Sequence, residues 1–307
     1  MEQNSFKVRS MAQVAQEAIN YISGRREHSI ASLKTRWNKF NKQCMGGIEP
    51  NIVMTIAGIS GSGKSSIANL IQTDIIDLNP NEEIIILCFS LEMVGFRQVG
   101  RTLSHKLRET TSTLYSSERD LDDETFRKVI AVSNQLKEYP IYFVDDPGTP
   151  KQVEEIIENF YKTHVEGTNK RFIIFYDHAL LTKQIGSVIE TISELQRVFI
   201  QTKKKPLTSV IQLSQMNRNI ESSERINNSL SHYPMRSDLS SSDAIFQASD
   251  YVFVIHRPEI LNIQEYGPNH LPTTNKVYIH VLKNRDAGKP CILEFENDLA
   301  YNNIVER

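Results

Sequence analysis

Hydrophobic and polar positions alternate in two ways along most of the chain. From residue 50 onward, short continuous apolar runs, typical of buried strands, are separated by longer segments with apolar residues at helical spacing. The predicted strands are 52–57, 84–90, 141–145, 171–176, 208–213, 251–256, 277–282 and 291–296. The predicted helices are 64–77, 94–108, 123–138, 151–164 and 187–202. This alternation favours an α/β fold with a mostly parallel central sheet flanked by helices. The last strands, which have no helices between them, predict an antiparallel extension at the C-terminus.

Residues 1–49 follow another pattern. Apolar side chains at helical spacing predict an amphipathic helix over 11–22, after an unstructured tail. The polar, basic linker that follows has Trp37 and Phe40 as its expected anchors. The predicted organisation is therefore tail, linker helix and linker, followed by one α/β domain over 50–307. The pattern alone favours neither of two alternatives: the helix folds back on its own domain, or it packs on a neighbouring subunit.

Composition narrows the class of protein. Hydrophobic residues make up 39% and charged residues 23% of the chain, as in globular proteins, and the longest apolar run, 84–89, is too short to span a bilayer. The N-terminus has no apolar core of a signal peptide, so we expect a cytoplasmic protein without a membrane partner. The three widely spaced cysteines form no metal-binding pair. With a net charge of −2, any contact with nucleic acid must come from basic residues gathered in one groove or channel.

The stretch GISGSGKS, from Gly58 to Ser65, matches the phosphate-binding loop pattern G-x-x-x-x-G-K-[ST] between a predicted strand and a predicted helix. Its glycines allow successive backbone N–H groups to surround an anion, and the N-terminus of the helix adds its positive dipole. Lys64 would contact the terminal phosphates, and the Ser65 hydroxyl would bind Mg²⁺. The chain is therefore predicted to bind a nucleoside triphosphate. The predicted contacts in this loop are Gly58, Ser60, Gly61, Ser62, Gly63, Lys64, Ser65 and Ser66.

Acidic and amide side chains follow several of the predicted strands. Asp177 comes directly after a buried strand, where a magnesium-binding Walker B aspartate is expected, and it completes the predicted nucleotide and metal site. Glu92 follows the second strand and would orient or deprotonate the attacking water. Asp145 and Asp146, after the third strand, are a competing pair. Gln215 ends another strand, where its amide could sense the terminal phosphate.

Two further segments match no defined motif but suggest a function. Lys283 and Arg285 lie two residues apart and so share one face of a strand, which suits a phosphate reached from outside, as by an arginine finger. The alternative, an ordinary basic hairpin, is favoured on this spacing alone. The polar stretch 219–243 has no periodicity and predicts a long mobile loop.

Taken together, these stretches resemble the motor domain of the DnaB-like replicative helicases, a family of RecA-like ATPases. The following stretches occur in the family's order from about residue 50 to the end: GISGSGKS, FSLEM, IYFVDD, FIIFYDH, QLSQMNR, the SDL…Q.SD segment and KNRDAGKP. The resemblance implies a DNA helicase or translocase of DNA replication that forms a ring, usually a hexamer. ATP and Mg²⁺ would lie between subunits and single-stranded DNA in the central channel, with a primase or a helicase loader as a further partner.

The resemblance also implies roles for particular residues. Glu92 would be the catalytic base, Asp177 the Walker B residue, and Gln215 would couple the phosphate to DNA-contacting loops. Lys283 and Arg285 would act on the ATP of the neighbouring subunit. The helix over 11–22 is similar to the family's linker helix, which docks on the adjacent subunit, and this favours the intersubunit alternative.

Three departures from the family's pattern change these expectations. No collar domain precedes the linker, which indicates a compact phage or mobile-element version, located in the host cytoplasm. His178 stands where tyrosine is usual. Where the family has SDLRESG in its channel loop, this chain has SDLSSSD, so that Ser240, Ser241 and Asp243 replace the expected arginine, glutamate and glycine.

A negative charge at Asp243 would repel a DNA phosphate, so any grip on DNA would rest on Arg218, Arg225 or Arg236 instead. An alternative function is therefore a RecA-like, DNA-associated ATPase that does not unwind, either an accessory of recombination and repair or a regulatory switch. A small-molecule kinase shares only the phosphate loop.

Overall fold

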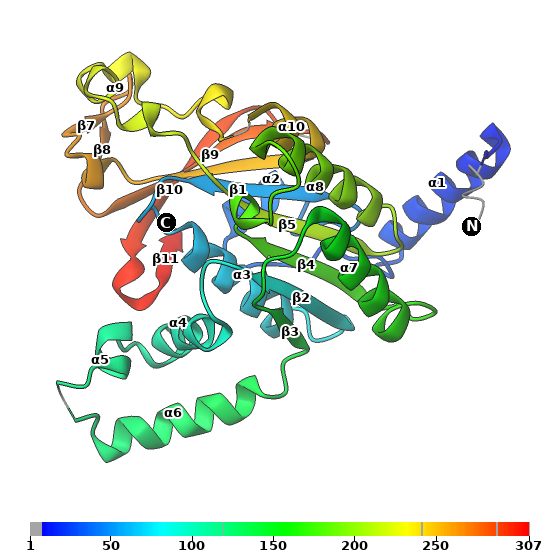
Figure 1. The fold of residues 1–307 in the computed structure, drawn as a ribbon, viewed down its shortest axis with the longest axis horizontal. Helices are drawn as coiled ribbons and strands as arrows, with labels where there is room; N and C mark the ends of the chain where they lie inside the picture. The colour runs from blue at the N-terminus through cyan, green and yellow to red at the C-terminus, as the bar shows by residue number, and fades with distance from the viewer. Residues whose placement is uncertain (1–7, 119, 241, 287, 307) are drawn as a thin grey trace.

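The computed structural model describes residues 8–118, 120–240, 242–286 and 288–306, and within this part of the chain the main sheet has nine strands (Figure 1). Its strands are β1 (Val53–Gly58), β2 (Ile84–Ser90), β3 (Ile141–Val144), β4 (Arg171–Asp177), β5 (Thr208–Gln215), β6 (Tyr251–His256), β9 (Lys276–Asn284), β10 (Cys291–Asp298) and β11 (Asn303–Glu306). Their order across the sheet is β11-β10-β9-β6-β1-β5-β4-β2-β3. The first six strands pair in parallel and the last three antiparallel, which confirms the predicted fold class. A separate hairpin pairs β7 (Glu265–Tyr266) with β8 (Leu271–Pro272).

Helices cover both faces of this sheet. The α-helices of the described residues are α1 (Met11–Arg26), α2 (Asn38–Gln43), α3 (Lys64–Asp77), α4 (Gly95–Leu107), α5 (Thr111–Tyr115), α6 (Asp123–Leu136), α7 (Pro150–His164), α8 (Val188–Thr202), α9 (Ser223–Asn227) and α10 (Ser242–Ala248). Because successive strand side chains point to opposite faces, the central strands β1, β2, β4 and β5 contribute to two cores. One core contains apolar residues of α2 and α3, and the other contains those of α7, α8 and α10. Among the described residues, no helix is long and apolar enough to cross a membrane.

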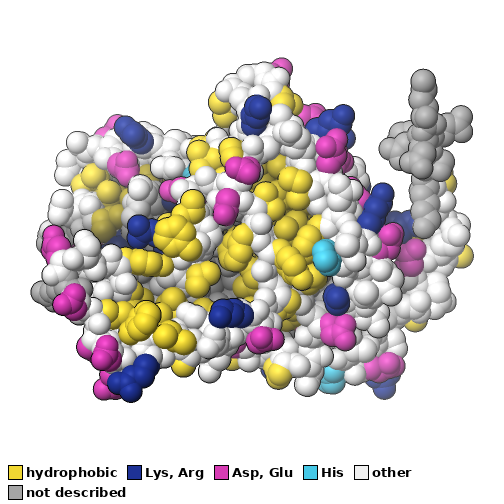
Figure 2. All heavy atoms as spheres, turned by 60° about the horizontal axis from the view of Figure 1, so that its bottom comes forward, with side chains coloured by type: hydrophobic (Ala, Val, Ile, Leu, Met, Phe, Trp, Pro, Cys, Tyr) yellow, Lys and Arg dark blue, Asp and Glu magenta, His cyan; other side chains and the backbone are white. Residues whose placement is uncertain are grey.

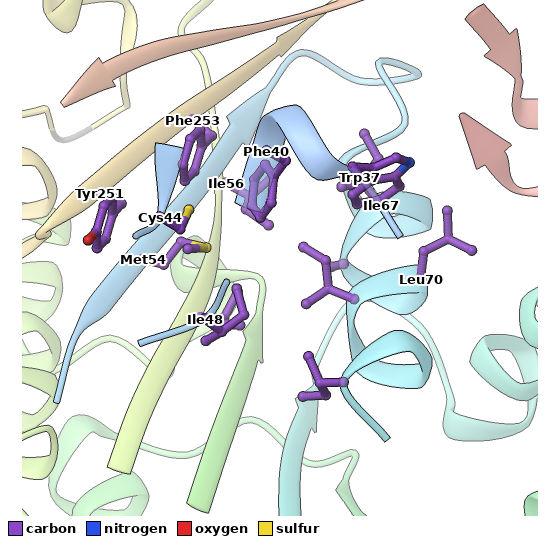
Figure 3. Packing of buried hydrophobic residues seen from close by; sticks show 14 of the residues in the cluster. Trp37, Phe40, Cys44, Ile48, Met54, Ile56, Ile67, Leu70, Tyr251 and Phe253 are labelled. Atoms are coloured by element: carbon purple, nitrogen blue, oxygen red, sulfur yellow. The ribbon is translucent and has the colours of Figure 1, made fainter. Parts of the chain in front are cut away.

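The linker before β1 packs into the first of these cores. Trp37 and Phe40 are both buried, the ring centroids of Phe40 and Phe253 are 4.8 Å apart, and the Trp37 indole N–H donates to the Ile304 carbonyl at 3.1 Å (Figure 3). Both residues are therefore confirmed as anchors. They belong to the same packed unit as β1, although they lie N-terminal to the boundary predicted at residue 50.

The segment 219–243 differs from its prediction. It contains α9 and the 3-10 helices Ser229–Ser231 and Arg236–Asp238, instead of one long irregular loop. These turns are too short to produce a periodic pattern, and they are fixed by a buried ion pair between Arg225 and Asp238. The structural part of the prediction is therefore wrong. The helix predicted over 11–22 is present but continues to Arg26.

Candidate active site

The phosphate loop lies in the middle of the sheet. Gly58, the last residue of β1, pairs with Gln215 of β5 on one side and with Ile255 of β6 on the other. One strand further along, Asp177 ends β4 opposite Ser90 of β2. Because parallel strands end at the same edge of a sheet, the residues that follow them converge there. This convergence brings Asp177, Glu92 and Gln215 to the phosphate loop, as the sequence predicted.

Two glycines allow the loop backbone to lie close to neighbouring atoms. A Cβ on Gly58 would lie 2.3 Å from the Ser62 Oγ, closer than real Cβ contacts. Gly63 has φ of 97°, in the left-handed region that favours glycine, and a Cβ there would meet the Leu299 side chain at 2.9 Å. The loop therefore requires glycine at both positions to direct its backbone into the cleft. Side chains and backbone that line this cleft belong to Ser60, Gly61, Gly63, Lys64, Ser65, Ser66, Glu92, Arg101, Arg257 and Leu299.

Asp177 is a buried carboxylate with unused hydrogen-bonding capacity. Burial and the charge of Glu92 raise the pKa of Asp177 to about 6, although Lys64, Arg101 and the Ser65 hydroxyl act in the opposite direction. Its Oδ1 is buried without a hydrogen-bond partner among the described residues. A hard cation with oxygen ligands would satisfy this atom and the nearby Ser65 hydroxyl together. The residues present therefore fit Mg²⁺.

Glu92 and the competing aspartate pair are placed differently. Glu92 lines the cleft, and its charge acts on Asp177. Asp145 and Asp146 follow β3, which is the edge strand of the sheet, two positions beyond β4. The cleft lining does not include either of them, as far as the described residues go. The geometry therefore favours Glu92.

Three residues near the phosphate loop had no place in the predicted site. Arg257 follows β6 and donates to the Gly61 carbonyl at 3.0 Å. Arg101 on α4 lines the cleft, where burial lowers its pKa against the charges of Asp177 and Glu92. Burial and the charge of Lys64 lower the pKa of His178. The position of Arg257 directly after an apolar run could have identified it, whereas Arg101 sits inside a helix with no local signal.

Lys283 and Arg285 lie at the opposite end of the strands from the phosphate loop. Lys283 pairs with Val252 near the start of β6, and its ammonium donates to the Phe246 carbonyl at 2.5 Å. Arg285 forms an ion pair with Asp250 at 3.1 Å. The length of β6, about 15 Å, separates this end of the strands from the end where the phosphate loop lies. The pair is thus remote from the nucleotide cleft of its own chain.

The three arginines predicted to contact DNA have different environments. Arg218 is exposed, and Arg236 is an exposed partner of Asp243 at 2.7 Å. Arg225 is buried, and two of its nitrogens donate to the Asp238 carboxylate at 3.0 and 3.1 Å. The predicted DNA contact of Arg225 is therefore wrong, because its guanidinium is enclosed and already bound. Of the replaced channel-loop residues, Ser241 lies outside the described residues.

The Arg225–Asp238 ion pair should be essential for the fold of segment 219–243. We expect Arg225→Met to lower the free energy of unfolding by about 3–5 kcal/mol, because it leaves a buried carboxylate without its partner. The matched control, Arg218→Met, removes an exposed arginine seven residues earlier and should change it by less than about 0.5 kcal/mol. Urea unfolding measures both, and equal effects would contradict a structural role for Arg225.

The chain matches the DnaB-like helicase C terminal domain family over residues 32–301. The replicative DNA helicase DnaB of Buchnera aphidicola subsp. Baizongia pistaciae is 26% identical over 236 residues, which cover 75% of this chain and 48% of that protein. The replicative DNA helicase DnaB of Mycoplasma genitalium is 26% identical over 252 residues, covering 79% and 50%. The chain thus spans about half the length of the curated relatives it matches.

Solved structures agree on the fold. A structure described as an ATPase domain superimposes with a TM-score of 0.79 at 21% identity, covering 95% of this chain and 98% of that one. A DnaB-like replicative helicase, described with its interactions with primase, superimposes with a TM-score of 0.77 at 18% identity, covering 98% and 68%.

Proposed function

The chain belongs to the DnaB-like helicase C-terminal domain family, and on that premise we propose that it is an ATP-driven translocase on single-stranded DNA that works as a helicase in DNA replication. One observation carries the proposal. Lys64, Asp177 and Glu92 meet in one cleft, while the Lys283–Arg285 pair lies at the opposite end of the strands. A chain with half of an ATPase site at each end of its strands is suited to form complete sites between copies.

Within the cleft, the residues divide the work of hydrolysis. Lys64 and the loop N–H groups bind the terminal phosphates, and Ser65 and Asp177 would hold Mg²⁺. When bound, the cation neutralises charge on the phosphates. Glu92 orients the attacking water and accepts its proton, and Gln215 contacts the terminal phosphate at the end of β5.

The second half of the site comes from an adjacent copy. Lys283 and Arg285 would reach the terminal phosphate in the neighbour's cleft and stabilise the charge that develops there, as an arginine finger does. A kinase that works as a monomer has no use for cations at this position. The arrangement therefore favours a ring, which we propose is a hexamer.

The N-terminal helix supports assembly between copies. In Figure 1, α1 extends away from the body, whereas α4, α5 and α6 form an arm on another side. Ile19 and Ile22 on α1 are 60% and 66% exposed. The arm also exposes apolar side chains, and Figure 2 shows hydrophobic side chains on the face brought forward from the bottom of Figure 1. The exposed hydrophobic residues of the arm and of the neighbouring β3 include Phe96, Tyr115, Phe126, Ile130 and Phe143. We propose that α1 docks on this arm in the next copy.

Charged substitutions on α1 should therefore dissociate the ring. Burying an isoleucine contributes roughly 1.5–3 kcal/mol, so Ile19→Asp with Ile22→Asp should weaken association at least about 100-fold. The matched control, Gln16→Asp with Asn20→Asp, adds the same charge to the polar face and should not. Sedimentation velocity in the presence of ATP measures assembly. Equal ring formation by both variants would contradict docking through this face.

The DNA contact is proposed for the exposed residues of the channel loop. Arg218 and Arg236 are exposed near this loop, although Arg236 also pairs with Asp243, and single-stranded DNA would lie against them in the central channel. A primase or a helicase loader would be a further partner of the ring. The test is ATP hydrolysis with and without single-stranded DNA at low salt. We expect stimulation by DNA, and hydrolysis that no nucleic acid changes would contradict the function.

A second function has one observation in its favour. Asp243 lies on the channel loop and pairs with Arg236, so the loop offers DNA a carboxylate beside its cation. This arrangement suits a DNA-associated ATPase that does not unwind. Unwinding of a forked duplex separates the two functions: a protein whose ATPase responds to DNA but which displaces no strand is the second kind.

A further inference from the structure

Phe246 on α10 lies within reach of two cations from different parts of the chain. The Arg236 guanidinium carbon is 4.8 Å from the centroid of its ring, and the Lys283 ammonium is 5.0 Å from the same centroid. Cations at this distance from an aromatic face are attracted by its quadrupole. One ring thus contacts both Arg236, which directly precedes the channel loop, and Lys283 of the Lys283–Arg285 pair.

The short helix α10 makes the same connection through polar contacts. Near its first turn, Asp243 binds Arg236 at 2.7 Å. Near its end, the Phe246 and Gln247 carbonyls accept from the Lys283 ammonium at 2.5 and 3.3 Å. The two sets of contacts lie three to four residues apart on this helix, which is about one turn.

The inner side of α10 is fixed to the body of the domain. Ile245 is completely buried and packs in the core formed by α7 and α8, and Ala248 is also buried. The helix therefore cannot follow a moving loop freely. Arg236 and Lys283 share the ring of Phe246, so a displacement of Arg236 changes the surroundings of Lys283. Burial and Arg285 lower the pKa of Lys283 most, and the charge of Arg236 adds a small effect in the same direction.

We propose that Phe246 is a positioning residue that couples occupation of the channel loop by DNA to the placement of Lys283 in the neighbouring ATP site. This inference rests on the proposed function. A DNA phosphate that binds Arg236 draws it from Phe246 and neutralises its charge, so the ring and the carbonyls of α10 hold Lys283 without a competing cation. Since coupling between two binding sites is reciprocal, the nucleotide at the interface must change the affinity for DNA in turn.

The test uses the assembled protein and fluorescent oligo-deoxythymidine. The affinity for the oligonucleotide is measured by anisotropy with ADP and with a non-hydrolysable ATP analogue, and the ratio of the two dissociation constants reports the coupling. Phe246→Leu keeps an apolar side chain but removes the aromatic face, and it should bring the ratio about fivefold closer to one, the value of a cation–π contact. Phe246→Tyr keeps the face and should retain the wild-type ratio.

Phe246→Met, which preserves the length of the side chain, gives a second measurement if the leucine variant does not fold. Sedimentation confirms that each variant forms the same assembly as the wild type. A wild-type ratio that both Phe246→Leu and Phe246→Met retain overturns the coupling role alone. A wild-type protein whose affinity for DNA is the same with both nucleotides overturns the coupling role together with the proposed translocase.

Discussion

Replacing Lys64 with alanine is expected to lower the rate of ATP hydrolysis by about 1,000-fold or more, the effect of removing a preorganised donor from a developing charge. Lys64 is the first residue of α3 and is only 7% exposed, so its ammonium is held in the cleft beside Glu92 and Arg101. Water cannot replace it there with equal strength. Phosphate release at saturating ATP and single-stranded DNA measures the loss.

The matched control for this variant is Lys204→Ala. Lys204 is an exposed lysine beyond the end of α8 and hydrogen-bonds only to the nearby Gln201 among the described residues. Its removal should leave the rate within about twofold of the wild type, as expected for a surface substitution. If Lys64→Ala hydrolyses ATP as fast as this control, the phosphate loop is not the active site.

Arg285→Ala is expected to lower hydrolysis by about 10³-fold or more while its own cleft still binds ATP. The physical reason is separation: Arg285 lies at the other end of the strands from its own phosphate loop, and we propose that it serves a neighbour's nucleotide. Arg197→Ala, on the exposed side of α8, is the matched control and should retain the wild-type rate. A variant that loses nucleotide binding and hydrolysis in parallel would indicate a role in its own cleft instead.

The sequence predicted the parts of the site that lie at strand ends. Each of Asp177, Glu92 and Gln215 follows an apolar run, and parallel strands ending at one edge brought these residues to the phosphate loop. The same rule would have found Arg257, which donates to the Gly61 carbonyl. Their chemical roles stay predictions, because geometry places side chains but does not measure turnover.

The features that the sequence did not predict depend on contacts between distant residues. Arg225 is bound by Asp238 in a segment without periodicity, so nothing local distinguishes it from an exposed, DNA-binding arginine. The short α10 gives no periodic signal, and its Phe246 contacts Arg236 and Lys283, which are far apart in the sequence. The linker was different, since Trp37 and Phe40 were large apolar residues in a polar stretch and could be identified as anchors.

The central claim is that each ATPase site is shared between two copies, and mixing two inactive variants tests it most directly. Lys64→Ala and Arg285→Ala subunits are combined in equal amounts, and hydrolysis in the presence of single-stranded DNA is compared with that of each variant alone. An Arg285→Ala subunit has an intact cleft, and a Lys64→Ala neighbour supplies the missing cation, so about a quarter of the interfaces in a random closed ring are complete. We predict that activity returns in the mixture, well above the average of the two variants. A mixture no more active than that average would contradict a shared site.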